Sequence, residues 1–174
     1  MRETCVGETW RTIWEEHPLE RRDRLIKERR HDPYEARGKP REPSACPTCH
    51  AVFHDGRWQW IRPAADAQDL VCPACQRAAE GMPAGILVLA GEFHLAHRVE
   101  ILGLIRSVEE RETKQHPLKR IMQVSESGDE LEVTTCEASL ARSIGDAIHH
   151  AYKGELDYHY PDDASDVLRV HWER

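Results

Sequence analysis

Two short cysteine motifs limit most tightly how this 174-residue chain can fold. They are Cys46-Pro-Thr-Cys49 and Cys72-Pro-Ala-Cys75, and 22 residues separate them. Each motif favours a tight turn that directs two thiolates at one point, and two such turns complete a tetrahedron around Zn²⁺. The separation is only slightly wider than in the usual zinc-ribbon pattern. We therefore predict a zinc ribbon over residues 44–83, with Cys46, Cys49, Cys72 and Cys75 as the ligands.

The predicted cofactor is one structural Zn²⁺, because four cysteines close the coordination shell that a catalytic zinc leaves open. The metal would supply folding energy to a small module. A disulfide role is disfavoured because nothing in the chain suggests secretion, and two matched pairs are better explained by one metal than by redox chemistry. His50 and His54 flank the first motif as alternative ligands, although thiolates compete better for zinc.

Charge and hydropathy indicate a cytoplasmic protein that does not contact a membrane. The formal net charge is −7, which excludes a uniformly basic protein. The longest clean apolar run, 86–90, is far shorter than the roughly 20 residues of a membrane-spanning helix. The first residues lead into charge rather than into the apolar segment of a secretory signal.

Residues 1–43 are predicted to form a charged, partly helical arm and linker. Trp10, Ile13 and Trp14 fall on one face of a short helix, and the two tryptophans alternatively dock on the protein's own core. The stretch 21–41 can attract phosphates even on an acidic protein, or it is simply a solvated charged surface. Its nine basic residues, against four acidic ones, are Arg21, Arg22, Arg24, Lys27, Arg29, Arg30, Arg37, Lys39 and Arg41.

Residues 84–174 are predicted to form a compact α+β domain, with two helices on a mostly antiparallel sheet. The plan is ferredoxin-like with one added strand. A Thr-x-x-Glu capping box at 134–137 would begin the second helix, and Gly154 would end it. The expected elements are strands at 85–90, 118–124, 130–135, 156–160 and 168–172, and helices at 92–112 and from 138 to Gly154.

Apolar stripes predict which side of each helix is buried. The first helix would bury Leu95, Leu102, Ile105, Val99, Ile101, Leu104 and Val108. The second would bury Leu140, Ile144, Ile148 and Ala151. Cys136 has no partner motif and is expected to be a small buried residue.

The ribbon alternates basic and aromatic residues, which can contact phosphates and stack on unpaired bases. We expect either Trp58 or Trp60 to pack beside the metal instead, and Arg77 to lie near the second cysteine motif. The predicted nucleic-acid contacts, from the arm and the ribbon together, are Arg21, Arg22, Arg29, Arg30, Lys39, Arg57, Trp60 and Arg62.

Nothing in the sequence argues for an enzyme or for a small-molecule substrate. The chain has no nucleophile elbow, phosphate-binding loop or glycine-rich dinucleotide motif. His94, His97 and Glu100 recur every three residues, and His116 follows. They could hold a second metal or act as acid and base, but a polar helix face is the favoured interpretation because no fourth ligand is fixed by spacing.

The C-terminal region adds a family resemblance to the paired cysteine motifs. The segments LARSIGDAI (140–148), YKGEL (152–156) and VLRVHW (167–172) resemble the archaeal and eukaryotic large-ribosomal-subunit export adaptor family, also named for nonsense-mediated decay. More closely, the chain resembles the short bacterial zinc-ribbon proteins related to that family. This resemblance implies zinc at the four cysteines and binding to the large ribosomal subunit.

Three functional hypotheses follow. The first is a ribosome-associated, rRNA-binding zinc protein that acts in large-subunit maturation or in stress-time ribosome inactivation. The second is a protein–protein or transcription-linked adaptor, which the net charge of −7 favours. The third is an enzyme that uses His94, His97 and His116.

Overall fold

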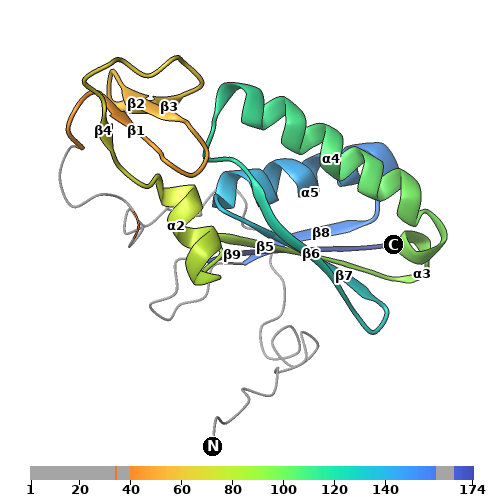
Figure 1. Cartoon of the computed structure of the whole chain (residues 1–174). Coiled ribbons are helices and arrows are strands. Elements are labelled where there is room, and N and C mark those ends of the chain that lie inside the picture. The colour runs from red at the N-terminus through yellow and green to blue at the C-terminus, as the bar shows by residue number, and fades with distance from the viewer. Residues whose placement is uncertain (1–33, 35–39, 160–166) are drawn as a thin grey trace, which may run out of the picture.

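A computed structural model describes Tyr34, residues 40–159 and residues 167–174 (Figure 1). The described chain forms two sheets, and the α+β class predicted from the sequence is confirmed. The small sheet has the order β3-β2-β1-β4. Its strands are β1 (Ser44–Ala45), β2 (Val52–His54), β3 (Arg57–Gln59) and β4 (Gln68–Asp69).

The larger sheet has five strands in the order β6-β7-β5-β9-β8. Three of its four pairings are antiparallel, and β5 with β9 is parallel. Its strands are β5 (Gly85–Ala90), β6 (Ile121–Ser127), β7 (Glu130–Thr135), β8 (Glu155–His159) and β9 (Leu168–Glu173). The helices are α2 (Pro73–Glu80), α3 (Glu92–Ala96), α4 (Arg98–Gln115) and α5 (Ala138–Tyr152).

The last strand, β9, is not added at an edge of the sheet. Strands β5 to β8 follow the strand–helix–strand–strand–helix–strand order of the expected plan, but β9 lies between β5 and β8. The sheet therefore departs from the four-stranded ferredoxin-like arrangement by the insertion of β9 beside the edge strand β8.

The main core lies between this sheet and the helices α4 and α5, which run side by side over one of its faces (Figure 1). Side chains alternate along each strand, so every second residue of β7 and β9 points into the core. The apolar side of α5 packs against these strand residues, and Leu140, Ile144 and Ile148 are fully buried as predicted. Ala151 is exposed, contrary to the prediction, because it lies beyond the last buried turn of the helix.

The single helix expected at 92–112 is two helices, so that prediction is wrong. His97 has non-helical backbone angles (φ −114°, ψ 26°) and separates α3 from α4. His94 lies in the interior, where it is 2% exposed, while Leu95 is 49% and Val99 is 81% exposed. The ring of Phe93 stacks on that of His97 at this break, with 4.1 Å between the ring centroids.

The start of α5 also differs from the expected capping box. Thr134 belongs to β7, and the N-cap is Glu137, with no side-chain hydrogen bond to the helix backbone. The Thr135 hydroxyl instead donates to the Glu137 carbonyl at 2.8 Å. At the other end Gly154 follows the C-cap Lys153 with a positive φ of 90°, as predicted for a C′ glycine.

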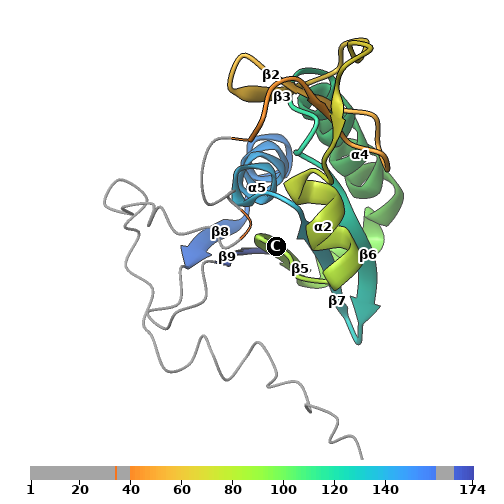
Figure 2. The same cartoon turned by 60° about the vertical axis from the view of Figure 1, so that its left-hand side comes forward.

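The ribbon forms the predicted hairpin between β2 and β3. Asp55 and Gly56 both have positive φ, which fits the two-residue turn expected there. The sequence analysis missed α2, which begins at the second cysteine motif and leads directly into β5 (Figure 2). None of the described helices is long and apolar enough to span a membrane.

Candidate metal centre

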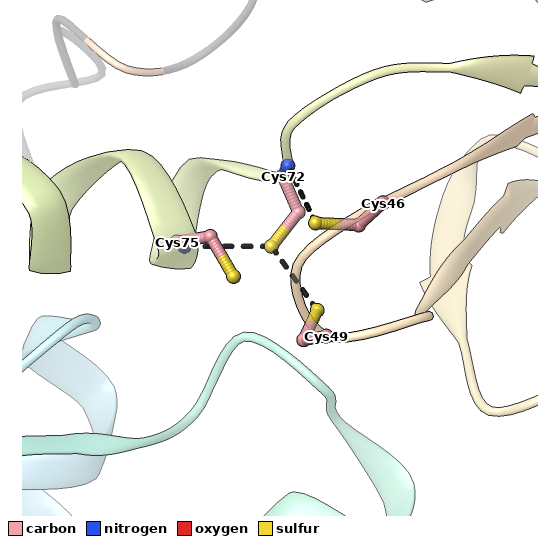
Figure 3. A group of neighbouring side chains, drawn as sticks. All are labelled: Cys46, Cys49, Cys72 and Cys75. Carbon is pink, nitrogen blue, oxygen red and sulfur yellow. Dashed lines mark hydrogen bonds between the residues drawn. The ribbon is translucent and has the colours of Figure 1, made fainter.

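The four motif cysteines meet at one point, with their side chains directed toward one another (Figure 3). Their sulfur atoms all lie within 4.8 Å of one another, and Cys49 Sγ is 3.6 Å from Cys72 Sγ. Bonds of about 2.3 Å in a tetrahedron would separate two sulfurs by about 3.8 Å. Cys46, Cys72 and Cys75 are buried and Cys49 is half-buried. The cluster can therefore hold one metal ion with four sulfur ligands.

Local backbone structure positions the first pair. Cys46 follows β1, and the chain returns on itself so that the His50 amide donates to the Cys46 carbonyl at 2.9 Å. His50 occupies the left-handed region with φ 65° to complete this turn. The Cys46 amide in turn donates to the Ala51 carbonyl at 2.8 Å, which joins the turn to β2.

A helix N-terminus positions the second pair. Cys72 is the N-cap of α2, and Pro73 at the first helical position is already suited to helix geometry. The Cys75 amide donates to Cys72 Sγ at 3.4 Å, and the Cys72 amide donates to Cys46 Sγ at 3.4 Å. Amide donors of this kind stabilise thiolates.

The four thiols are not equivalent. Burial raises the pKa of Cys46, but amide donors, chiefly that of Cys72, outweigh it and hold the pKa at about 6. Burial raises the pKa of Cys49 and, more strongly, that of Cys72, where neighbouring sulfurs add to the rise. A bound metal cation would overcome the raised pKa values of Cys49 and Cys72, because coordination deprotonates thiols outright.

Arg120 lies against the cluster, and sequence analysis missed it. Its Nη2 donates to Cys75 Sγ at 3.3 Å and to Cys72 Sγ at 3.5 Å. Burial lowers the pKa of Arg120, but the nearby sulfurs outweigh burial and raise it above its usual range. Arg120 lies 45 residues after Cys75, between α4 and β6, so no motif spacing could have indicated the contact.

The cysteine cluster shares a second, smaller core with residues near β6 and β7. The Cys136 thiol is buried and donates to the Ala74 carbonyl at 3.5 Å, which confirms the expected burial. Trp58, Leu118 and Met122 pack against the same cluster. Trp58 is thus the tryptophan beside the metal site, and its ring also lies 5.6 Å from that of Phe53.

The alternative ligands lie elsewhere. His54 is exposed and faces Glu42 at 4.0 Å and Asp55 at 3.7 Å, and those three residues form a separate surface group. His50 is exposed and belongs to neither group. Within the described residues, these two groups alone have the ligand spacing for a metal.

The other histidines do not converge. His94 is buried with Nδ1 2.7 Å from the Gly91 carbonyl, and His97 stacks on Phe93. His116 follows the far end of α4, whose 18 residues span about 27 Å. The structure therefore separates His116 from His94 and His97.

The predicted nucleic-acid contacts fall into two sets. Arg57, Trp60 and Arg62 are exposed on the ribbon. Arg77, expected only to lie near the second cysteine motif, does so in α2, where it is 5% exposed, donates to the Met82 carbonyl and lies over the Tyr34 ring. The arm residues Arg21, Arg22, Arg29, Arg30 and Lys39 lie outside the described residues.

Comparisons with known proteins identify no relative. No family model matches the chain, and no curated protein or solved structure matches it either. The resemblance to the ribosomal export adaptor family accordingly stays a prediction.

Proposed function

We propose that the protein binds one structural Zn²⁺ through its four motif cysteines and uses the resulting ribbon to bind ribosomal RNA in the cytoplasm. Four sulfur donors in a closed shell are typical of structural zinc. A ribbon with strands of only two or three residues has little core of its own, so the metal would supply much of its folding energy.

Trp60 carries the RNA part of the proposal. Its side chain remains 44% exposed although the indole Nε1–H donates to the Thr113 carbonyl at 2.6 Å. A rigid exposed ring suits base stacking, which is worth about 1–3 kcal/mol per base. Arg57 and Arg62 are exposed on either side of it in sequence and can contact the flanking phosphates. The target would be the large subunit, in maturation or in stress-time inactivation.

A protein adaptor is the second candidate. Ile61, Leu70 and Val71 are also exposed on the ribbon, with exposed fractions of 41%, 37% and 46%. Apolar side chains of this kind suit a protein partner better than a phosphate backbone.

Co-sedimentation with purified large ribosomal subunits distinguishes ribosomal RNA binding from the protein-adaptor function. We expect binding that weakens steeply with salt, because each phosphate contact releases counterions. Binding that is insensitive to salt would favour the protein adaptor, and no binding above that of an unrelated acidic protein would overturn the ribosomal proposal.

A further inference from the structure

An open pocket of about 500 Å³ lies where the ribbon meets the C-terminal half of α4. Both parts of the molecule contribute walls, since Trp60 comes from the ribbon and Arg120 from the segment before β6. The residues that line it are Trp60, Glu109, Glu110, Thr113, Lys114 and Arg120.

The aromatic wall is held in place. The bond from Trp60 Nε1 to the Thr113 carbonyl fixes the indole against α4 and leaves the ring accessible. The Thr113 hydroxyl is itself engaged with the Lys119 carbonyl at 2.5 Å, so Thr113 is held from two directions. This wall is a flat, preformed surface on which a planar group can stack.

The charged side chains of the pocket differ in whether they already have a hydrogen-bond partner. Glu109 accepts from the Ile121 amide at 2.7 Å, and Arg120 faces the cysteine sulfurs. Glu110 and Lys114 are exposed, and neither makes a side-chain hydrogen bond or ion pair with another described residue. The pocket therefore offers one unengaged carboxylate and one unengaged ammonium beside an aromatic face.

We propose that this pocket binds one unpaired guanine base of RNA. The base would stack on Trp60, its N1–H and N2–H would donate to the Glu110 carboxylate, and Lys114 would contact a flanking phosphate. Guanine presents two adjacent, parallel N–H donors, the fork that a carboxylate accepts in two bonds. Adenine, cytosine and uracil lack that fork. The inference rests on the proposed RNA binding and specifies the base at that site.

An arginine side chain of a partner protein carries the same fork, but the charges disfavour it. Lys114 and Arg120 balance the carboxylates of Glu109 and Glu110 in the same pocket, so an incoming guanidinium would add a positive charge that no further lining residue compensates. A neutral base attached to an anionic phosphate meets a carboxylate and an ammonium instead.

Binding of the full-length protein to short RNAs tests the proposal. The probes are fluorescein-labelled 9-mers of uridine with guanosine, inosine, adenosine or cytidine at the centre, and the readout is anisotropy. Inosine keeps N1–H and lacks the N2 amine. We expect the guanosine probe to bind at least about fivefold more tightly than each of the others. About fivefold is the lower end of the discrimination that a bidentate base contact provides.

The variant Glu110→Gln should reduce that preference to less than twofold, and Lys114→Gln should weaken all four probes equally. Glu100→Gln is the matched control, because it removes the same charge from the same helix outside the pocket.

Equal binding of all four probes by the wild type, or a preference that survives Glu110→Gln, overturns the guanine site while subunit binding can still stand. Absence of all RNA binding overturns the proposed function as well. Glu110-dependent binding of an arginine-rich peptide, with no guanine preference, assigns the pocket to a protein partner and overturns the proposal.

Discussion

The guanidinium of Arg120 bridges Cys72 and Cys75, with Nη2 at 3.5 Å and 3.3 Å from their sulfur atoms. Four thiolates around a divalent cation would carry a net charge of −2, and Arg120 would compensate part of it. The contact also ties the second cysteine motif to the segment that connects α4 with β6. The cysteine cluster and the segment before β6 are therefore joined by these Arg120 contacts as well as by packing.

Removal of the Arg120 guanidinium should loosen the metal. Mutation of a residue that hydrogen-bonds to a metal ligand typically lowers metal affinity about 10- to 100-fold. We expect Arg120→Gln to transfer zinc to a chromogenic chelator at least about tenfold faster than the wild type. Arg120→Lys should be intermediate because it keeps the charge and loses the planar fork, and Arg106→Gln, an exposed change on α4, should match the wild type. Equal release by all four proteins would contradict this role.

Metal content should depend on the four motif cysteines and not on Cys136. Cys72→Ser should reduce bound zinc from one ion per chain to near zero, as measured by mass spectrometry of the purified protein. Cys136→Ser is the control, because that thiol lies in the same cluster but donates to the Ala74 carbonyl. Retention of a full equivalent of zinc by Cys72→Ser would contradict the assignment.

The two ribbon tryptophans should separate stability from binding. Trp58→Ala removes a half-buried ring that packs on the cysteine cluster and on Phe53, and should lower the free energy of unfolding by about 1–3 kcal/mol. Trp60→Ala should leave the unfolding free energy within about 1 kcal/mol. It should weaken RNA binding at every salt concentration by about 1–3 kcal/mol. Chemical denaturation and anisotropy measure the two effects, and the reverse pattern would exchange the two roles.

Two glycines should respond oppositely to alanine. A Cβ on Gly85 would lie 2.7 Å from Ala141 Cβ and 3.2 Å from Ala138 Cα, so Gly85→Ala should cost about 1–3 kcal/mol. Gly103 lies on the exposed side of α4 with nothing within 4 Å, and Gly103→Ala should stabilise the protein by about 0.5–1 kcal/mol. Thermal unfolding measures both, and a tolerated Gly85→Ala would show that α5 can move away from β5.

The pair Glu112 and Lys119 should make a pH-dependent contribution to stability. The Lys119 ammonium, 2.8 Å away, lowers the pKa of the Glu112 carboxyl below its usual value. A carboxyl with a lowered folded-state pKa stabilises the fold above its unfolded pKa of about 4.3. That contribution is lost as the pH falls through the lower, folded-state value.

We therefore expect Glu112→Gln to lower the free energy of unfolding by up to about 1 kcal/mol at pH 7. The difference from the wild type should shrink as the pH falls below about 4. Glu110→Gln removes an unengaged carboxylate from the same helix and should follow the wild type throughout. A Glu112→Gln difference that is constant between pH 7 and pH 3 would assign the effect to packing.

The sequence by itself determined the features that short-range chemistry controls. Cys46 and Cys49, like Cys72 and Cys75, are close along the chain, so their convergence within each motif is a local property. The turn at Asp55-Gly56 needs two residues that accept positive φ, and that requirement is visible in the residue types. The buried stripe of α5 follows from the helical period.

Only the tertiary structure decided how distant segments use those features. The contact of Arg120 with Cys75 joins residues 45 positions apart, and the bond of Trp60 to Thr113 joins residues 53 apart. Periodicity carries no information about such pairs, because it describes one element at a time. The same limit applies to the missed break at His97, because the apolar pattern runs through it without interruption although Leu95 and Val99 are exposed in the structure.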